Sequence, residues 1–363
     1  MDSKGCVVLV TGGSGFLGQH VVGLLQERAD HVTGIRVLDV IPYKNKLDII
    51  IDYAERLPVQ QYVGSVTDKD LVQRACKGVD CVMHVASIVD TSLIPDEDLS
   101  YKINVAGTKN VIAGCRKNGV KRLLYCSTVE VVTGTGNIYD GTEDNTEYAT
   151  SHLFKAYGST KVEAERLVLE ANCSELKTLA LRPAVMYGEL EWRSLGRHAT
   201  GFLAQKMGRY VRLDCKNGLV EHVYVGNVAW GFVSAENNFH EGRIQQGSTG
   251  CGYFIVDDSP RTNLSAFMDN ILLEIGLKPF ALTLPIWIFV FPLYILYLLL
   301  SLISIVHRVN FFVGIIPFMS LHRICLFRYE KASKYLGYKP LYSYDEAKQR
   351  TVKFFQSCLS TRS

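Results

Sequence analysis

Three evenly spaced glycines, Gly12-x-x-Gly15-x-x-Gly18, constrain the fold of this chain more than any other feature of its sequence. They follow the short β-branched run at 7–10 and precede a segment, 17–25, whose apolar residues recur at helical spacing. A strand, a glycine turn and a helix in this order bring backbone N–H groups at the helix N-terminus close to a bound pyrophosphate. The sequence therefore predicts a dinucleotide-binding turn here, rather than a purely structural one.

Further strands and helices alternate behind this turn. Apolar runs typical of strands, and the helical stretches between them, lie at 35–38, 62–64, 69–76, 79–86, 99–115, 122–127 and 178–181. Strands that alternate with helices indicate βαβ units, so we expect an α/β fold with a doubly wound parallel sheet. We assign the sheet to residues 1–183 and a smaller substrate-binding region to residues 184–278 and 322–363.

A carboxylate stands where the second expected strand ends. Asp39 follows Gly18 by 21 residues, a spacing at which its side chain can bind a ribose 2′-hydroxyl and would repel a 2′-phosphate. The glycine turn contains no arginine to offset that repulsion, although Arg36 is nearby. The pattern favours NAD over NADP.

A tyrosine and a lysine stand four residues apart in Tyr157-Gly-Ser-Thr-Lys161, which places both on one helical face. The lysine cation is expected to lower the pKa of the Tyr157 phenol by stabilising the phenolate. The tyrosine can then exchange a proton with a substrate hydroxyl while a hydride moves to nicotinamide. Ser127 and Thr128 end an upstream strand and could hold the same substrate oxygen. Taken alone, the tyrosine–lysine spacing is also compatible with a surface helix.

Together these motifs resemble the extended short-chain dehydrogenase/reductase superfamily, and within it the 3β-hydroxysteroid dehydrogenase/Δ5-Δ4 isomerase family. The segments that carry the resemblance are TGGSGFLG (11–18), KINVAGTKNV (102–111), YGSTK (157–161), LVLEAN (167–172), RPAVMYG (182–188), HVYVGNVAWG (222–231) and YFIVDDSP (253–260). The resemblance implies a Rossmann-type domain, a smaller substrate-binding region, and a C-terminal apolar, membrane-associated insert at 279–321.

The resemblance also implies roles for single residues. Tyr157 would be the general acid/base, Lys161 would hold the nicotinamide ribose, and Thr128 would orient the substrate hydroxyl, with Ser127 as its substitute. The cofactor would be lined by Gly12, Gly15, Phe16, Leu17 and Gly18 at the pyrophosphate, Asp39 at the adenosine ribose, Val66 at the adenine, Ala86 and Pro183 near the nicotinamide, and Tyr157 and Lys161. Asn104 would brace the active-site strand.

The acidic pair Asp257-Asp258 invites a second activity. A Δ5-3-ketosteroid isomerises when a base removes a C4 proton and an acid returns one at C6, and a carboxylate can serve as the base. The family resemblance implicates this segment in isomerisation, with Tyr253 as a proton donor. The alternative is a strand-ending turn in which an aspartate caps the following helix.

We therefore expect NAD-dependent oxidation of a 3β-hydroxy-Δ5-steroid to the 3-ketone, followed by isomerisation to the conjugated Δ4-3-ketone. Three alternatives stay open: a C4-decarboxylating sterol dehydrogenase, a nucleotide-sugar epimerase and a non-enzymatic dinucleotide sensor. An epimerase needs no apolar insert, and sensors of this class typically lose the tyrosine or the lysine, whereas this chain keeps both. A homodimer is also left open.

Residues 281–306 form an almost wholly apolar run of 26 residues, long enough at about 1.5 Å per residue to cross a hydrocarbon core of about 30 Å. A second apolar stretch, 309–321, follows. Pro285 and Pro292 can break the first run, and the segment behind it resembles the closing part of the substrate domain. We therefore expect monotopic or re-entrant attachment to the endoplasmic reticulum bilayer with both flanks cytosolic. A single span and a mitochondrial membrane are the alternatives.

The charge balance is close to neutral: 39 Lys+Arg against 36 Asp+Glu give a net charge of +3. This balance provides no basic face for nucleic acid, so no nucleic-acid partner is expected. The 10 cysteines contain no CxxC pair, which argues against a metal site and against a disulfide scaffold. With no secretory signal at the N-terminus, we expect reduced cytosolic thiols.

Overall fold

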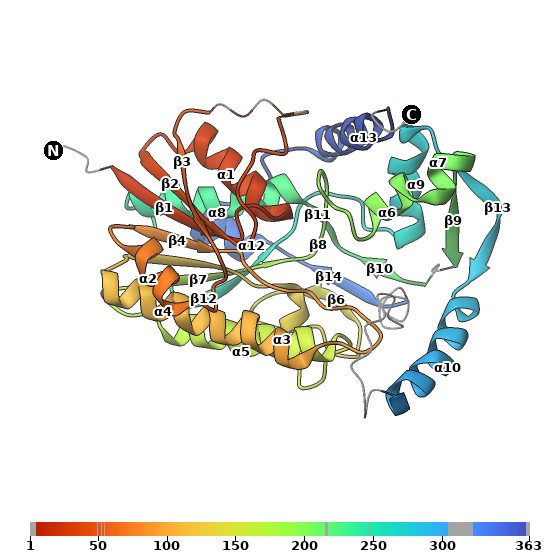
Figure 1. The fold of residues 1–363 in the computed structure, drawn as a ribbon, viewed down its shortest axis with the longest axis horizontal. Helices are drawn as coiled ribbons and strands as arrows, with labels where there is room; N and C mark the ends of the chain where they lie inside the picture. The colour runs from red at the N-terminus through yellow and green to blue at the C-terminus, as the bar shows by residue number, and fades with distance from the viewer. Residues whose placement is uncertain are drawn as a thin grey trace.

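A computed structural model describes residues 5–48, 50–51, 53, 55–214, 217–245, 247–303 and 322–360. Its main sheet has seven parallel strands in the spatial order β3-β2-β1-β4-β5-β7-β12 (Figure 1). Their bounds are β1 (Cys6–Thr11), β2 (Val32–Asp39), β3 (Val59–Val63), β4 (Cys81–His84), β5 (Arg122–Cys126), β7 (Lys177–Pro183) and β12 (Cys251–Ile255). The strand order reverses at β1, so a ligand crevice is expected where the carboxyl ends of β1 and β4 diverge.

Helices cover both faces of this sheet (Figure 1). α1 (Phe16–Arg28) and α8 (Val225–His240) pack against each other on one face, while α2 (Lys69–Cys76), α4 (Gly107–Asn118) and α5 (Lys155–Glu170) cover the other. Strand side chains alternate between the faces. In β1, Val8 and Val10 therefore join one apolar core and Leu9 joins the other.

The expected Rossmann-type parallel sheet is confirmed, with one change in its helices. The helix expected over 99–115 begins earlier, as α3 (Glu97–Tyr101), and passes through the π-helical turn η1 (Lys102–Ala106) into α4. A π-turn inserts an extra residue into a helix and is frequent at functional sites. Here it places Asn104 toward the crevice, as described below.

The main sheet is not confined to residues 1–183, where we expected it to end. β12 and α8 both come from the later part of the chain, yet β12 is the edge strand beside β7 and α8 packs on α1. The reason is burial: β12 reads Cys-Gly-Tyr-Phe-Ile and has four buried residues in a row, which is typical of a covered parallel strand.

The remaining elements form the smaller region beside the carboxyl edge of the sheet. Its small sheets pair β8 (Val185–Tyr187) with β11 (His222–Tyr224), β9 (Arg209–Asp214) with β13 (Lys278–Pro285), and β10 (Leu219–Val220) and β6 (Ile138–Gly141) with β14 (Ile324–Phe327). Its helices are α6 (Leu195–Thr200), α7 (Phe202–Met207), α9 (Leu264–Ile275), α12 (Glu330–Leu336) and α13 (Tyr344–Ser360). α12 packs on β12 and α8, and α13 packs on α9 and α6, so the segment 322–360 returns to the same body as the residues before the apolar run.

The apolar run splits into two elements at Pro285. Residues 281–285 end β13, and α10 (Trp287–Ile303), which contains Pro292, points away from the rest of the molecule (Figure 1). Among the helices of the described ranges, none combines the length and the apolar character needed to cross a bilayer. Residues 304–306 and the second apolar stretch, 309–321, lie outside the described residues.

Candidate active site

The glycine turn leaves no room for side chains. Gly12 has a left-handed φ of +73°, and a Cβ atom there would lie 2.8 Å from the backbone N and Cα of Ala86. A Cβ at Gly18 would lie 2.1 Å from the Gly12 carbonyl oxygen. Such a cradle, open at the start of α1, fits the close approach of a pyrophosphate to backbone N–H groups.

Asp39 lies beside this turn at the end of β2. Its carboxylate accepts hydrogen bonds from the backbone N–H of Ser14, at 3.0 Å, and of Ile41, at 3.1 Å. Arg36 points elsewhere, since its guanidinium donates to the carbonyl oxygens of Ala75 and Lys77. The Asp39 carboxylate therefore lies against the glycine turn, and the nearby arginine is engaged away from it.

Thr128, Tyr157 and Lys161 lie together where β5 meets α5. The Thr128 hydroxyl is hydrogen-bonded to the Tyr157 phenol, which favours the phenolate. The Lys161 ammonium is almost fully buried, at 1% exposure. It donates to the Cys126 carbonyl oxygen at 2.6 Å and lies 4.2 Å from the centre of the Tyr125 ring. Thr128 and Tyr157 thus lie in contact, and Lys161 lies buried one helical turn after Tyr157 on α5.

The electrostatics of this group differ from expectation in one respect. Burial is the main cause that raises the pKa of the Tyr157 phenol above its usual value, and the charge of Glu130 adds to it. Burial also lowers the pKa of Lys161 to about 8. The buried lysine therefore does not by itself produce a low phenol pKa, and proton removal from Tyr157 depends on what else enters the site.

Ser127 has a different role from its neighbour Thr128. Its hydroxyl donates to the Glu165 carboxylate, which also accepts from the Tyr148 hydroxyl at 2.7 Å and from the Arg182 guanidinium at 3.1 and 3.2 Å. Glu165 is fully buried and Arg182 nearly so. Ser127 is thus a positioning residue that fixes the loop carrying Thr128. Glu165 lies four residues after Lys161 on α5, a helical spacing from which the sequence reasoning could have found it.

Asn104, in the π-turn, connects three elements. Its side-chain oxygen accepts from the Ile88 N–H at 2.9 Å, and its amide donates to the Ile88 carbonyl and to the Thr160 hydroxyl of α5. It thereby ties the loop after β4 to the helix that carries Tyr157. Ala86, in the same loop, donates its N–H to the Thr11 hydroxyl at 3.2 Å, next to the glycine turn.

The other residues expected to line the cofactor come from several elements of the main sheet and its helices. Leu17 is buried in α1 and Phe16 is partly buried beside it, directly after the glycine turn. Pro183 ends β7. Val66 is buried, and its side chain packs against Gly107 of α4, where a Cβ would meet it at 2.6 Å. The side chain of Val66 therefore contributes to the core beneath the expected adenine position.

Comparison with known proteins agrees with this geometry. The family model described as "3-beta hydroxysteroid dehydrogenase/isomerase family" matches residues 9–286. The chain belongs to the 3β-hydroxysteroid dehydrogenase/isomerase family. It is 33% identical to mouse "3 beta-hydroxysteroid dehydrogenase type 7", over 97% of this chain and 96% of that protein.

Solved structures show the same fold at lower identity. The epimerase Mth375 from Methanothermobacter thermautotrophicus has a TM-score of 0.73 and 18% identity, covering 99% of this chain and 94% of its own. The UDP-glucose 4-epimerase of Thermus thermophilus, in complex with NAD, has a TM-score of 0.68 and 21% identity, covering 96% and 99%.

Two of the residues expected to isomerise a steroid, Tyr253 and Asp257, are buried and make hydrogen bonds within the protein. The Tyr253 hydroxyl is buried and donates to the Ser248 carbonyl oxygen at 2.6 Å. Asp257 is buried and accepts from the Tyr224 N–H, the Asn227 amide and the Ser259 N–H, at 2.9, 2.7 and 3.0 Å.

Asp257 thus holds the start of α8, which precedes it in the chain. The helix that follows, α9, is capped by Asn263, so the expected aspartate cap is not observed. Asp258 is exposed on the surface and accepts from the Tyr329 hydroxyl. The structure does not bring Tyr253, Asp257 and Asp258 together as a proton-transfer group.

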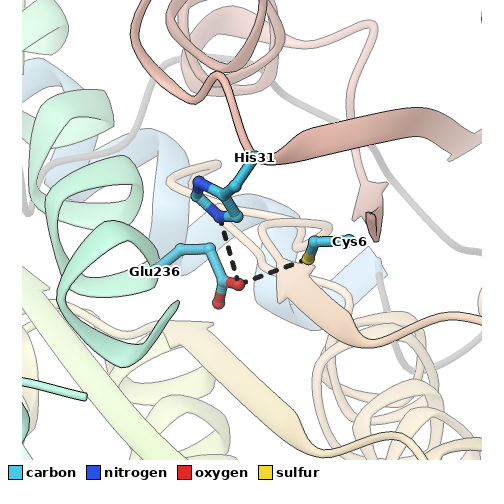
Figure 2. Close-up of side chains that lie close together, drawn as sticks. All are labelled: Cys6, His31 and Glu236. Atoms are coloured by element: carbon cyan, nitrogen blue, oxygen red, sulfur yellow. Dashed lines mark hydrogen bonds and ion pairs between the residues drawn. The ribbon is translucent and has the colours of Figure 1, made fainter. Parts of the chain in front are cut away.

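A separate group lies outside the active site of this family member, where Cys6, His31 and Glu236 come together (Figure 2). The Cys6 thiol donates to Glu236 at 3.4 Å, and His31 Nε2 lies 3.7 Å from the same oxygen. Zinc accepts these ligand types. However, Arg122 donates to both Glu236 oxygens, at 2.8 and 2.7 Å, and already supplies the compensating charge. We interpret the group as an ion pair that joins α8 to the sheet.

Proposed function

We propose that this protein oxidises the 3β-hydroxyl group of a Δ5-steroid with NAD and then isomerises the product to the Δ4-3-ketone. The observation that carries the proposal is the contact of Thr128 and Tyr157 beside buried Lys161, in a chain of the 3β-hydroxysteroid dehydrogenase/isomerase family. The name of the mouse relative supports a 3β-hydroxysteroid as the substrate class.

The chain's own residues fit NAD. The cradle at Gly12 and Gly18 accommodates a pyrophosphate, and Asp39 faces the position of the adenosine ribose. NAD, when bound, supplies the hydride acceptor. The solved relative from Thermus thermophilus, whose title includes NAD, supports the same cofactor.

In the oxidation step, Thr128 and Tyr157 receive the substrate 3β-hydroxyl group between them. Thr128 orients the hydroxyl, and the Tyr157 oxygen, in its phenolate form, takes the hydroxyl proton as C3 loses a hydride. The Lys161 cation, one helical turn after Tyr157 on α5, would offset the negative charge that develops on the phenol oxygen. Ser127, Glu165 and Asn104 hold these groups in place through the hydrogen bonds described above.

The test is NADH formation by the purified protein with pregnenolone, dehydroepiandrosterone and an oxysterol. We expect turnover with at least one of them and formation of the conjugated enone. No turnover with any of the three contradicts the proposal. Carbon dioxide release from a 4-carboxysterol would instead identify a C4-decarboxylating sterol dehydrogenase.

Cofactor preference gives a separate prediction. Asp39→Ala removes the anion from the position of a 2′-phosphate, so kcat/KM with NADP should rise relative to NAD. A repulsion of about 1.4–2.8 kcal/mol corresponds to roughly a 10- to 100-fold change in that ratio. Asp30→Ala, on the turn before β2, is the matched control. A wild-type protein that prefers NADP would contradict the role of Asp39.

We further propose that the protein is attached to the cytosolic face of the endoplasmic reticulum through the apolar insert. Large apolar side chains are exposed along α10, with Trp287 at 67%, Phe291 at 64% and Leu299 at 56%. An apolar surface of this kind marks contact with lipid or with another protein. The basic residues of the following segment favour its retention on the cytosolic side; they are Arg323, Arg328, Lys331, Lys334 and Lys339.

The return of residues 322–360 to the main body supports monotopic attachment. β14 pairs with β10 and β6, so a single crossing between residues 285 and 322 would separate paired strands by a bilayer. We therefore expect a C-terminal tag to be digested by protease in sealed microsomes without detergent, and the protein to resist carbonate extraction. A tag protected until detergent is added would show a single span, and release by carbonate would show peripheral attachment.

A further inference from the structure

Glu130 is an acidic residue next to the reacting groups whose role the oxidation does not explain. It lies in the short 3-10 turn η2 (Val129–Val131), two residues after Thr128, and its backbone N–H donates to the Thr128 hydroxyl at 3.2 Å. Its charge also acts on the Tyr157 phenol. Glu130 thus lies on the turn that begins at Thr128, close enough for its charge to act on the second of the two hydroxyl groups proposed to receive the steroid oxygen.

Glu130 as a residue is half-buried, but one of its carboxylate oxygens is buried and lacks a hydrogen-bond partner. Its Oε2 atom has no hydrogen-bond partner among the described residues. The Arg323 guanidinium, whose charge acts on Glu130, likewise has a buried Nε without a partner in the part of the chain that the structure describes. Leaving a buried carboxylate oxygen unpaired costs about 1–3 kcal/mol, so it is retained where it serves a purpose.

We propose that Glu130 is the base that isomerises the Δ5-3-ketosteroid, an inference that rests on the proposed function. Its free oxygen removes a proton from C4, whose C–H electrons form the C3–C4 double bond of a dienolate. The hydroxyl groups of Tyr157 and Thr128 donate hydrogen bonds to the negatively charged steroid oxygen at C3. The carboxylic acid then returns a proton to C6 as the C4–C5 double bond forms, so the carboxylate is restored without an oxidant or reductant.

Proximity favours Glu130 over the acidic pair near residue 257. A ketone oxygen held between Thr128 and Tyr157 places C4 two bonds away, and Glu130, on the turn that begins at Thr128, is an acidic residue whose charge acts on that phenol. Asp257 has its oxygens occupied by three donors, and Asp258 is exposed. Among these three carboxylates, only Glu130 has a buried oxygen atom without a hydrogen-bond partner in the described residues.

The environment also suits a base at neutral pH. Burial raises the pKa of Glu130 to about 7, and Arg323 counteracts this rise. The other titratable groups that act on it or contact it are the Tyr157 phenol, the Cys325 thiol and the His152 ring, which lies 3.1 Å from the Glu130 carbonyl oxygen. A carboxyl with this pKa is partly ionised at pH 7 and is basic enough to remove a proton beside a ketone.

The test separates the two steps with the full-length, membrane-bound protein. Isomerisation is measured with a prepared Δ5-3-ketosteroid by the ultraviolet absorbance of the enone, and oxidation is measured by NADH formation. In Glu130→Gln, isomerase kcat should fall by about 10²- to 10⁴-fold, and dehydrogenase kcat by less than about tenfold. Glu130→Asp should recover part of the isomerisation, and Glu147→Gln, at an exposed position, is the surface control.

A stability measurement distinguishes catalysis from folding. The folded-state pKa of Glu130 lies above the value for an unfolded glutamate, so the folded protein binds the extra proton, and wild-type stability falls as pH rises from about 4.5 to about 7. Glu130→Gln lacks this loss and should therefore melt at a higher temperature than wild type at pH 8. A variant that melts lower and loses both steps equally would show a structural role and overturn the inference.

Two further outcomes would overturn the inference and leave the dehydrogenase proposal standing. One is isomerisation by Glu130→Gln within about tenfold of wild type, especially if Asp258→Asn abolishes it. The other is a wild-type protein that oxidises the steroid but never forms the enone. Absence of NADH formation in wild type would instead contradict the proposed function itself.

Discussion

Tyr157→Phe should reduce the kcat of steroid oxidation by about 10²- to 10⁴-fold, because it removes only the hydroxyl that takes the substrate proton. The ring remains, so packing between β5 and α5 should be preserved, and KM should change far less than kcat. The measurement is steady-state NADH formation with whichever steroid is turned over fastest. Turnover equal to wild type would contradict the role given to Tyr157.

The control for this variant is Tyr139→Phe. Tyr139 lies on β6 and is 65% exposed, so its hydroxyl belongs to the surface and its loss should leave turnover within about twofold of wild type. The pair therefore compares the same chemical change at the candidate active site and outside it. Equal losses in both variants would indicate a general effect on the preparation rather than a loss of proton transfer.

Glu165→Gln should reduce the free energy of unfolding by about 3–5 kcal/mol, because it leaves the buried Arg182 guanidinium without its counter-charge. The substitution keeps the volume of the side chain, so the effect would come from charge rather than from a cavity. Chemical denaturation of the purified protein, followed by circular dichroism, measures it. A change below about 1 kcal/mol would show that the pair does not support the fold.

Glu163→Gln is the matched control for charge loss, since Glu163 lies on the same helix and pairs with Lys109 at 3.3 Å in a half-exposed position. Exposed pairs contribute about 0–1 kcal/mol, so this variant should unfold almost as wild type does. Glu165→Gln should also lower turnover, because Ser127 donates its hydroxyl to Glu165 and fixes the loop that presents Thr128.

The role of Glu165 shows why the site was only partly predictable. Tyr157 and Lys161 share a helix, and a helical spacing of four is enough to place them on one face. Ser127 was expected to be interchangeable with Thr128, yet its hydroxyl is committed to a carboxylate 38 residues later in the chain. Which of two adjacent hydroxyl groups faces the pocket depends on that distant partner, and sequence spacing contains no information about it.

The isomerase assignment shows the same limit. Asp257-Asp258 ends a strand, and the acidic pair drew attention because its chemistry suits a base. The folded chain places Asp257 at the start of α8 and exposes Asp258, while the charge of Glu130, which the sequence reasoning passed over, acts on Tyr157. Burial and missing hydrogen-bond partners distinguish a catalytic carboxylate from a structural one, and both are tertiary properties.

The sequence by itself determined the features that depend on local geometry: the turn between β1 and α1, Asp39 at the end of β2, the parallel sheet, and the apolar run beyond residue 280. Each follows from spacing over a few residues, because helices and strands repeat at short, constant intervals. Only the tertiary structure decided that β12 completes the main sheet and that residues 322–360 return to the body that precedes the apolar run. Only the tertiary structure, too, paired Glu165 with Arg182 and left an oxygen of Glu130 unpaired. These outcomes depend on which distant segments bury one another, and the free energy of a charge is set by that burial.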